Sequence, residues 1–284
     1  MKYKGSAQRP LLTLDKKSAV VYRKQEEVSI PEKYQMIAAE AFKGNPKMKS
    51  LEIGPGMKKI GMRAFQGCIK LTKVRMAHSV NHLSEGCFSA CPHLSEMQIS
   101  SKVSEIPPSA FKEDRKLRQV DFADNSLLLK IREDAFNECA SLAYIKIPES
   151  LIDIGDRAFY RCKSLKEIIF PESLKIIGRE AFYFCGLEFI HLPKSLEVIE
   201  ESAFFKCNNL TEVFIPKNVK HIGPYAFHGC NRLRMLEIRH DPEFIGDWII
   251  NKAATIRCYK GSAVDTYCQE RELNVEYITP DKCI

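Results

Sequence analysis

The chain has 284 residues, of which 45% are hydrophobic and 28% charged, a composition that fits one large or two ordinary folded domains and excludes a disordered chain. The net charge of +7 is distributed among interleaved acidic and basic residues, and no Lys/Arg run alternates with aromatic residues. We therefore expect no nucleic-acid partner.

The N-terminal segment carries weak strand signals and no export signal. Residues 11–31 contain alternating apolar residues, which predict two short strands ahead of the repeat described below. Residues 1–20 have a basic start but neither a sustained apolar run nor a small-residue cleavage site. No apolar stretch reaches the length of about 18 residues that crosses a bilayer, so we expect no membrane insertion.

The dipeptide Ala-Phe recurs about every 23 residues through the middle of the chain, with Cys87-Phe88 at one step. Its occurrences are Ala41-Phe42, Ala64-Phe65, Ala110-Phe111, Ala135-Phe136, Ala158-Phe159, Ala181-Phe182, Ala203-Phe204 and Ala226-Phe227. The aligned units share the pattern A-F-x-x-C-x-x-L-x-x-I-x-I-P-x-x-[LV]-x-x-I-G-x-x. Such self-similarity is the signature of a repeat architecture, here of nine coils.

Each recurring position has a physical role in a stacked coil. The I-x-I pair, as in Val213 and Ile215, has the spacing of a short strand with one buried face. The following proline, as at Pro216, lacks an amide donor and ends the strand ladder, and a glycine such as Gly223 suits a corner. One coil cannot bury its own apolar stripe, so the coils must stack and align their strands in a parallel sheet.

The cysteines follow the same register. Of the 11 cysteines, seven lie three residues after the Phe of their coil: Cys68, Cys91, Cys139, Cys162, Cys185, Cys207 and Cys230. Stacking predicts an internal ladder in which Cys acts as a small buried hydrophobe. Asn45 and Asp114 replace Cys in two coils, which an obligatory pairing scheme would tolerate poorly, so we predict free thiols.

Two segments resemble ligand sites only when the register is ignored. One contains residues at spacings typical of zinc ligands: His78, His82, Cys87, Cys91 and His93. The register directs Cys91 inward and the two upstream histidines outward, so these side chains diverge. The other, from Ile53 to Gly61, occupies the turn after a strand and lacks the G-K-[ST] ending of a phosphate loop. We expect neither a metal site nor a phosphate site.

Catalytic signatures are missing from the sequence. No H-E-x-x-H, G-x-S-x-G or protein-kinase motif occurs, and the remaining histidines and carboxylates fall on outward positions without visible convergence. We therefore predict that the protein is not an enzyme and uses no cofactor.

The C-terminal segment departs from the repeat and indicates a cap. It predicts a strand, a turn at Lys260-Gly261, a helix with Ser262 as its N-cap, and a last strand from Val275 to Ile278. Terminal coils must present a wettable outer side. We divide the chain into an N-terminal cap at residues 1–27, a solenoid at residues 28–250 and a C-terminal cap at residues 251–284.

The repeat pattern resembles that of the BspA-type leucine-rich-repeat family over about nine coils from Val28 to Ile238, and a K-G-S-x-x-x-x-Y helix commonly closes arrays of that family. The resemblance implies an α/β-type repeat protein: a right-handed leucine-rich-repeat solenoid with short parallel strands on the concave face and a C-terminal capping unit. It also implies surface or secreted proteins that adhere to host proteins or other cells, and it brings no catalytic residues.

A partner would most readily bind the strand face, because parallel strands on one side of a solenoid form an extended surface. The outward positions of the early coils are polar, whereas later coils place apolar residues there. The candidate partner-binding residues are Tyr144, Ile169, Phe189, Phe214 and Met235, with Lys146, His191 and Glu212 at the polar edge. The alternative is that these residues belong to an ordinary solvent-exposed surface.

Two non-catalytic functions remain open from the sequence. The first is a monomeric protein-binding or adhesion module for a protein or glycan partner, at the cell surface or secreted as the family resemblance implies. The second is an intracellular interaction scaffold of the same fold, since residues 1–20 carry no export signal and a ladder of thiols suits reducing conditions.

Overall fold

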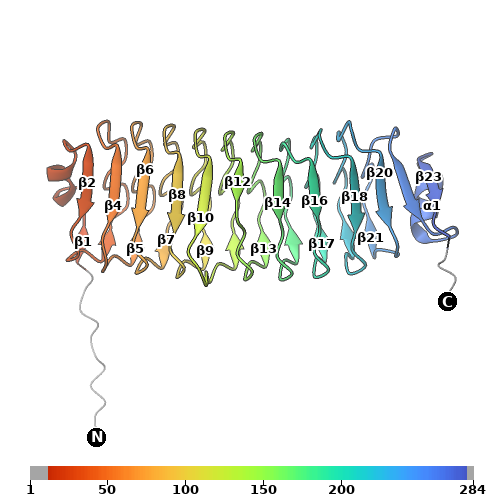
Figure 1. The fold of residues 1–284 in the computed structure, drawn as a ribbon, viewed down its shortest axis with the longest axis horizontal. Helices are drawn as coiled ribbons and strands as arrows, with labels where there is room; N and C mark the ends of the chain where they lie inside the picture. The colour runs from red at the N-terminus through yellow and green to blue at the C-terminus, as the bar shows by residue number, and fades with distance from the viewer. Residues whose placement is uncertain (1–11, 280–284) are drawn as a thin grey trace, which may run out of the picture.

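The computed structural model describes residues 12–279 and shows an elongated stack of coils whose two ends lie far apart (Figure 1). Each coil contributes one strand to each of two rows of parallel strands. The first row consists of β2 (Glu27–Ile30), β4 (Ser50–Ile53), β6 (Lys73–Met76), β8 (Glu96–Ile99), β10 (Gln119–Phe122), β12 (Tyr144–Ile145), β14 (Glu167–Ile169), β16 (Phe189–His191), β18 (Glu212–Ile215), β20 (Met235–Ile238), β22 (Thr255–Cys258) and β23 (Asn274–Tyr277). We call the surface formed by its outward side chains the strand face.

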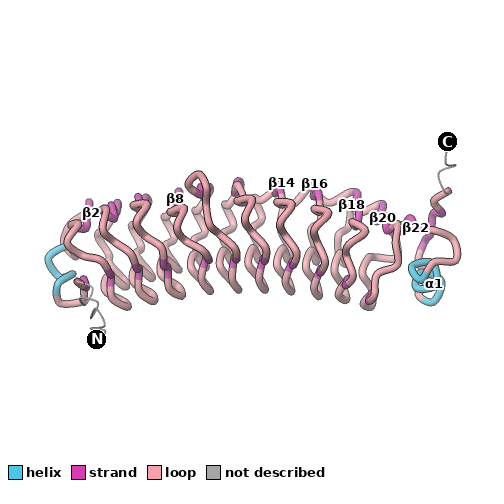
Figure 2. The backbone as a smooth tube through the Cα atoms, turned by 90° about the horizontal axis from the view of Figure 1, so that it is seen from below, coloured by secondary structure: helices cyan, strands magenta, loops and turns pink. Residues whose placement is uncertain are grey.

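The second row arises from the [LV]-x-x-I half of the repeat. It consists of two-residue strands: β1 (Thr13–Leu14), β3 (Met36–Ile37), β5 (Lys59–Ile60), β7 (His82–Leu83), β9 (Glu105–Ile106), β11 (Lys130–Ile131), β13 (Asp153–Ile154), β15 (Ile176–Ile177), β17 (Val198–Ile199), β19 (His221–Ile222) and β21 (Phe244–Ile245). Turns and loops connect the two rows, and Figure 2 shows that the whole stack curves only gently.

The predicted parallel register is confirmed. In β18 and β20, Val213 pairs with Leu236 and Ile215 with Ile238, and all four side chains point into the core. The first-row strands divide into ladders of six strands (β2 to β12), two strands (β14 and β16) and four strands (β18 to β23). The interruptions fall among coils that contain the strand-ending proline.

Proline shortens most of the strands that precede it. In early coils the residue at this position donates a backbone hydrogen bond to the previous coil, as from Ala77 to Ile53 and from Ala123 to Ile99, both at 3.0 Å. Pro148 and Pro171 have no N–H to donate. Accordingly β12 and β14 have two and three residues, whereas β6 and β10 have four.

A ladder of stacked phenylalanine rings fills the centre of the coils. The nine rings from Phe42 to Phe227 are fully buried. Their planes are nearly parallel, and ring centroids of successive coils are 5.1–5.3 Å apart at every step but one. The exception joins Phe88 to Phe111, whose centroids are 5.9 Å apart. Offset stacking of this kind adds to the free energy gained by burial alone.

The cysteine column is buried as predicted, but its thiols also have a hydrogen-bonding role that hydrophobicity alone does not predict. Each Sγ lies within hydrogen-bond distance of the phenylalanine carbonyl oxygen of the preceding coil, for example 3.0 Å from Cys185 to Phe159 and 3.2 Å from Cys230 to Phe204. Burial raises the pKa of Cys230 to about 12, so its thiol keeps the proton that it donates. A protonated, buried thiol is chemically inert.

Asp114 interrupts the cysteine column. Its side chain is fully buried, and its Oδ1 accepts a 2.7 Å hydrogen bond from the Cys91 backbone N–H. Its Oδ2 has no hydrogen-bond partner within the described residues. Burial raises the pKa of the Asp114 carboxyl well above its ordinary value. The widest step of the phenylalanine ladder ends in this coil, at Phe111.

The corner glycines allow close packing of neighbouring coils, which the sequence pattern did not specify. Gly155, Gly178 and Gly223 do not have the positive φ that favours glycine. Instead, the preceding coil packs against them: a Cβ on Gly178 would lie 2.7 Å from the carbonyl carbon of Gly155. Glycine is therefore required there for close approach of two backbones.

The two ends of the stack differ in how well the sequence predicts them. At the N-terminus, β1 and β2 are the two strands predicted within residues 11–31, and residues Ser18–Tyr22 between them form a 3-10 helix that we did not predict. At the C-terminus the predicted strand, helix and last strand are confirmed, with α1 (Ala263–Glu270) between β22 and β23 and the Ser262 Oγ accepting from the Asp265 N–H. Cys283 lies outside the described residues. The predicted repeat solenoid with parallel strands is confirmed.

Candidate functional site

The predicted partner-binding residues lie together on five successive strands of the strand face, β12 to β20. Each of these coils offers two outward positions, in its strand or directly after it, which stack into two columns. Column one contains Tyr144, Glu167, Phe189, Glu212 and Met235. Column two contains Lys146, Ile169, His191, Phe214 and Glu237.

Apolar side chains alternate between the two columns from one strand to the next. Tyr144, Phe189 and Met235 occupy every second strand in column one. Ile169 and Phe214 occupy the intervening strands in column two. We call these five residues the apolar track.

The apolar track is exposed to solvent along most of its length. The side chains of Ile169 and Phe189 are 74% and 61% exposed, and more than half of Tyr144 and Phe214 is also exposed. Met235 is half-buried. The neighbouring inward residues, such as Ile168 and Ile190, are buried in the core, so the track residues are not needed to fill it. A row of exposed apolar side chains on one face is typical of a contact surface.

In each column, the positions between the apolar residues of the track carry polar side chains. Glu167 pairs in register with Phe189, and Glu212 pairs with Met235. Neither carboxylate has an ion-pair partner among the residues that the structure describes. Glu237, at the end of column two, differs because the Arg257 guanidinium lies 3.2 Å from it.

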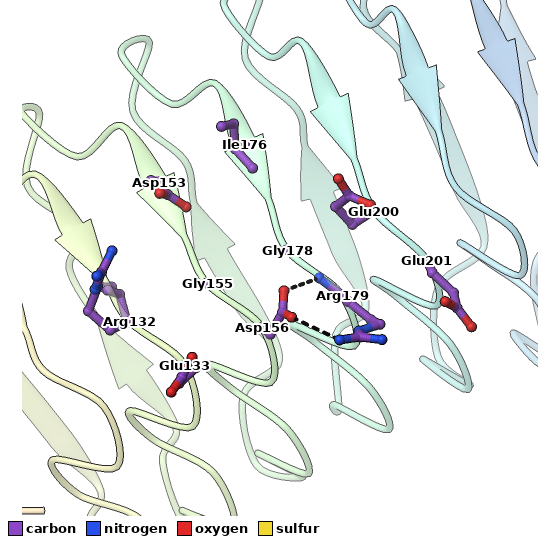
Figure 3. Close-up of a pocket in the computed structure, with 11 residues that line it drawn as sticks. Arg132, Glu133, Asp153, Gly155, Asp156, Ile176, Gly178, Arg179, Glu200 and Glu201 are labelled. Atoms are coloured by element: carbon purple, nitrogen blue, oxygen red, sulfur yellow. Dashed lines mark hydrogen bonds and ion pairs between the residues drawn. The ribbon is translucent and has the colours of Figure 1, made fainter. Parts of the chain in front are cut away.

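A hollow of about 550 Å³ lies away from the apolar track, along the second row of strands (Figure 3). Figure 3 shows Asp156 directed toward Arg179, where its Oδ1 accepts from the Arg179 N–H at 2.9 Å. No serine, cysteine or histidine lines the hollow, and its ionisable side chains are carboxylates and two arginines.

The two segments that resemble ligand sites follow the repeat register. Cys87 and Cys91 are buried, whereas His82 and His93 are exposed, and the His93 Nδ1 lies 2.8 Å from the Ile69 carbonyl oxygen. No group of three or more His, Cys, Asp or Glu residues within residues 12–279 could hold a metal ion. The glycine-rich segment from Ile53 to Gly61 runs from the last residue of β4, through the turn that follows, to the residue after β5.

A second aromatic row escaped the sequence analysis. The residue after each Ala-Phe is aromatic in four successive coils, and these half-buried rings stack with centroids 4.8–5.8 Å apart: Tyr160, Tyr183, Phe205 and His228. The self-alignment of the repeat already contained this signal. Because each inner ring is covered by its neighbours, the row offers mainly ring edges to solvent.

Comparisons with known proteins agree with this architecture. The model of the BspA-type leucine-rich-repeat region matches residues 16–128 and 129–257 in six copies. The chain is similar to the pneumococcal vaccine antigen PcpA, at 18% identity and a TM-score of 0.55, over 90% of this chain and 80% of that chain. It is also similar to a leucine-rich cell-surface protein from Faecalibacterium prausnitzii, at 22% identity and a TM-score of 0.48, over 98% of this chain and 86% of that one.

The similarity to the pneumococcal antigen shows a shared fold. A search of curated proteins found no match. The structure contains no helix within residues 12–279 with the length and apolar character needed to cross a bilayer. From the repeat pattern, the stacked coils and the family match over most of its length, the chain belongs to the BspA-type leucine-rich-repeat family.

Proposed function

We propose that the chain is a non-catalytic protein-interaction module that holds a protein partner against strands β12 to β20. The observation that carries the proposal is the apolar track, which is exposed although the core beneath it is complete. Repeat solenoids generally bind partners through an extended surface. Aromatic side chains at the centre of such a surface contribute most of the binding energy in typical interfaces.

Phe189 is the central anchor of this site. Its ring is 61% exposed on β16, the middle strand of the five. Phe214 on the next strand is 51% exposed and lies in the other column. Exposed aromatic rings have few rotatable bonds to immobilise, so they lose little conformational entropy when a partner covers them.

The test compares a double substitution in the track with a matched substitution elsewhere. Partners captured by the immobilised chain are identified, and their Kd values are measured for the native chain, for Phe189→Ala with Phe214→Ala, and for Phe244→Ala. Phe244 is a suitable control because it is 48% exposed but lies on β21 in the second row. We expect at least a tenfold weaker Kd for the double variant, about 1.4 kcal/mol or more, and no change for the control.

Unchanged binding of every captured partner by the double variant would exclude the apolar track as the site. The double variant must also retain the native urea midpoint. Surface substitutions of this kind usually change the free energy of unfolding by less than about 0.5 kcal/mol.

A further inference from the structure

The spacing of the apolar track restricts the kind of partner that can cover it. Neighbouring strands are about 4.8 Å apart, so the five track residues lie at about 0, 4.8, 9.6, 14.4 and 19 Å along the solenoid axis. They also alternate between two columns separated by two residues of strand, which is about 6.7 Å. A partner along the axis therefore meets an apolar group about every 4.8 Å, first on one side and then on the other.

An α-helix with an apolar seam has nearly the same spacing. With a rise of 1.5 Å per residue, the a and d positions of successive heptads lie at about 0, 4.5, 10.5, 15 and 21 Å, and they also alternate between two rows. The mismatch over the whole track is less than about 2 Å. A helix of about 14 residues is sufficient to cover it.

Two other backbone conformations fit the apolar track less well. Side chains on one face of a β-strand recur every 6.6–6.8 Å or so, which does not match either the single or the double strand spacing. A polyproline helix repeats every three residues, or about 9.3 Å, close to two strands, but its intermediate residues lie at about 3.1 and 6.2 Å. Between two apolar residues of one column, the track places an apolar residue of the other column about halfway along the axis. Of the three conformations, only the α-helix has a side chain near that halfway point.

The charged residues beside the track indicate which side chains the bound helix carries on its flank. Glu167 and Glu212 are exposed, lie on either side of Phe189 in column one, and have no ion-pair partner in residues 12–279. Column two instead presents His191 between its two apolar residues and Lys146 beside Ile169, and its Glu237 is already paired with Arg257. Column one is therefore complementary to basic side chains.

We infer that the partner presents an amphipathic α-helix of about two heptads, with apolar residues at a and d and Lys or Arg on the flank that faces Glu167 and Glu212. The helix lies along the solenoid axis across β12 to β20. This inference rests on the proposed function, because it specifies what binds the same site.

The test uses three stapled 18-residue peptides and one proline-rich peptide of equal length, each titrated against the full chain by fluorescence anisotropy. The first stapled peptide carries Leu at a and d, Lys at the flanking e positions and Gln elsewhere. The second carries Glu at the e positions. The third has the composition of the first, with its leucines distributed around the helix.

We expect the first peptide to bind at least tenfold more tightly than each of the other three. Phe189→Ala with Phe214→Ala should weaken its binding at least tenfold, and Phe244→Ala should leave it unchanged. Glu167→Gln with Glu212→Gln should remove the preference for Lys over Glu, because no carboxylate then remains in column one. The same preference should decrease as salt screens the exposed charges.

The inference is wrong if none of the peptides binds, if the peptide without a seam binds as well as the first, or if the proline-rich peptide binds most tightly. A natural partner that still depends on Phe189 and Phe214 would then leave the proposed function intact. Only a natural partner that is insensitive to both residues would contradict the proposed function itself.

Discussion

Strands β4 to β10 and strands β12 to β20 share one core but present different surfaces. In both regions buried phenylalanine rings stack at almost the same distance, 5.1 Å from Phe42 to Phe65 and 5.2 Å from Phe204 to Phe227. The outward positions of the first region carry exposed charged or polar groups such as Lys73 and Glu96. Those of the second region carry the apolar track.

Two sets of positions therefore have different roles. The inward positions stabilise the solenoid, and the outward positions distinguish one part of its surface from another. Inward positions must repeat, because each coil has to match the coil on either side. Outward positions on the strand face have no such neighbour to match, so they can be polar in one region and apolar in the next. Function therefore resides in the positions that do not repeat.

The largest expected effect tests this separation directly. Phe65→Ala in the first region and Phe159→Ala in the second each remove a fully buried ring, and each should lower the free energy of unfolding by about 3–5 kcal/mol. Phe189→Ala on the strand face should change it by less than about 0.5 kcal/mol. Urea denaturation followed by circular dichroism measures all three.

A cost for Phe189→Ala comparable with that for Phe159→Ala would mean that the apolar track belongs to the core. A much smaller cost for Phe65→Ala than for Phe159→Ala would mean that the two regions do not share one continuous core. Either result would contradict the comparison between the two regions.

The inward positions were predictable from the sequence for the same reason that they repeat. Aligning the chain with itself placed Ile145, Phe159 and Cys162 in the core, and the structure confirms each. The C-terminal helix after Ser262 was predicted from its N-cap residue instead, and it is also confirmed. The alignment could not predict the 3-10 helix at Ser18–Tyr22, because a cap has no second copy to align with. It also gave no sign that Cys thiols satisfy carbonyl oxygens of the preceding coil, since spacing does not reveal donors.

For the candidate site, the sequence predicted the location and not the occupant. The register placed Tyr144 and Phe214 outward, where the structure also has them exposed. The pairing of strands adds that Glu167 lies directly beside Phe189. A partner's chemistry depends on that two-dimensional arrangement, which a linear spacing of 22 or 23 residues does not display.

The next effect concerns the junction between the two regions, where Asp114 interrupts the cysteine column. We expect Asp114→Asn to raise the free energy of unfolding at pH 7 by about 1–3 kcal/mol, because it replaces a buried carboxyl, whose charged form is penalised by burial, with a neutral amide. The folded-state pKa of Asp114 is raised, so the folded chain holds this proton more tightly than the unfolded chain does. The stability linked to that proton is present below the unfolded pKa of about 3.9 and is lost as pH rises through the folded pKa.

The gain from Asp114→Asn should therefore be smallest near pH 4 and grow toward pH 8 in urea titrations. Asp124→Asn, at an exposed position ten residues later in the sequence, is the matched control and should give no such trend. A difference between Asp114→Asn and the native chain that stays constant with pH would show that Asp114 is not protonated in the folded state.

The smallest effect comes from the backbone at the Ala-Phe side of the coils, where the residue three positions after the Ala adopts a left-handed conformation. The first coils place Gly44 and Gly67 there, with φ of 66° and 69°, whereas Ala90 has φ of 55° with a side chain present. A residue with a Cβ loses about 1–2 kcal/mol of stability when it adopts the left-handed conformation, and glycine avoids this cost. Glycine, however, loses about 0.5–1 kcal/mol more backbone entropy on folding than alanine does, which offsets part of the difference. Ala90→Gly should thus stabilise the chain by about 0.5 kcal/mol.

Gly67→Ala is the reciprocal change and should destabilise by a similar amount, because a Cβ there meets no atom closer than 3.9 Å and only the backbone conformation opposes it. Urea midpoints of the two variants measure both effects against the native chain. If both substitutions shift the midpoint in the same direction, the two coils do not share one backbone requirement. Opposite shifts would show that this turn, like the phenylalanine ladder, is common to coils whose strand faces differ.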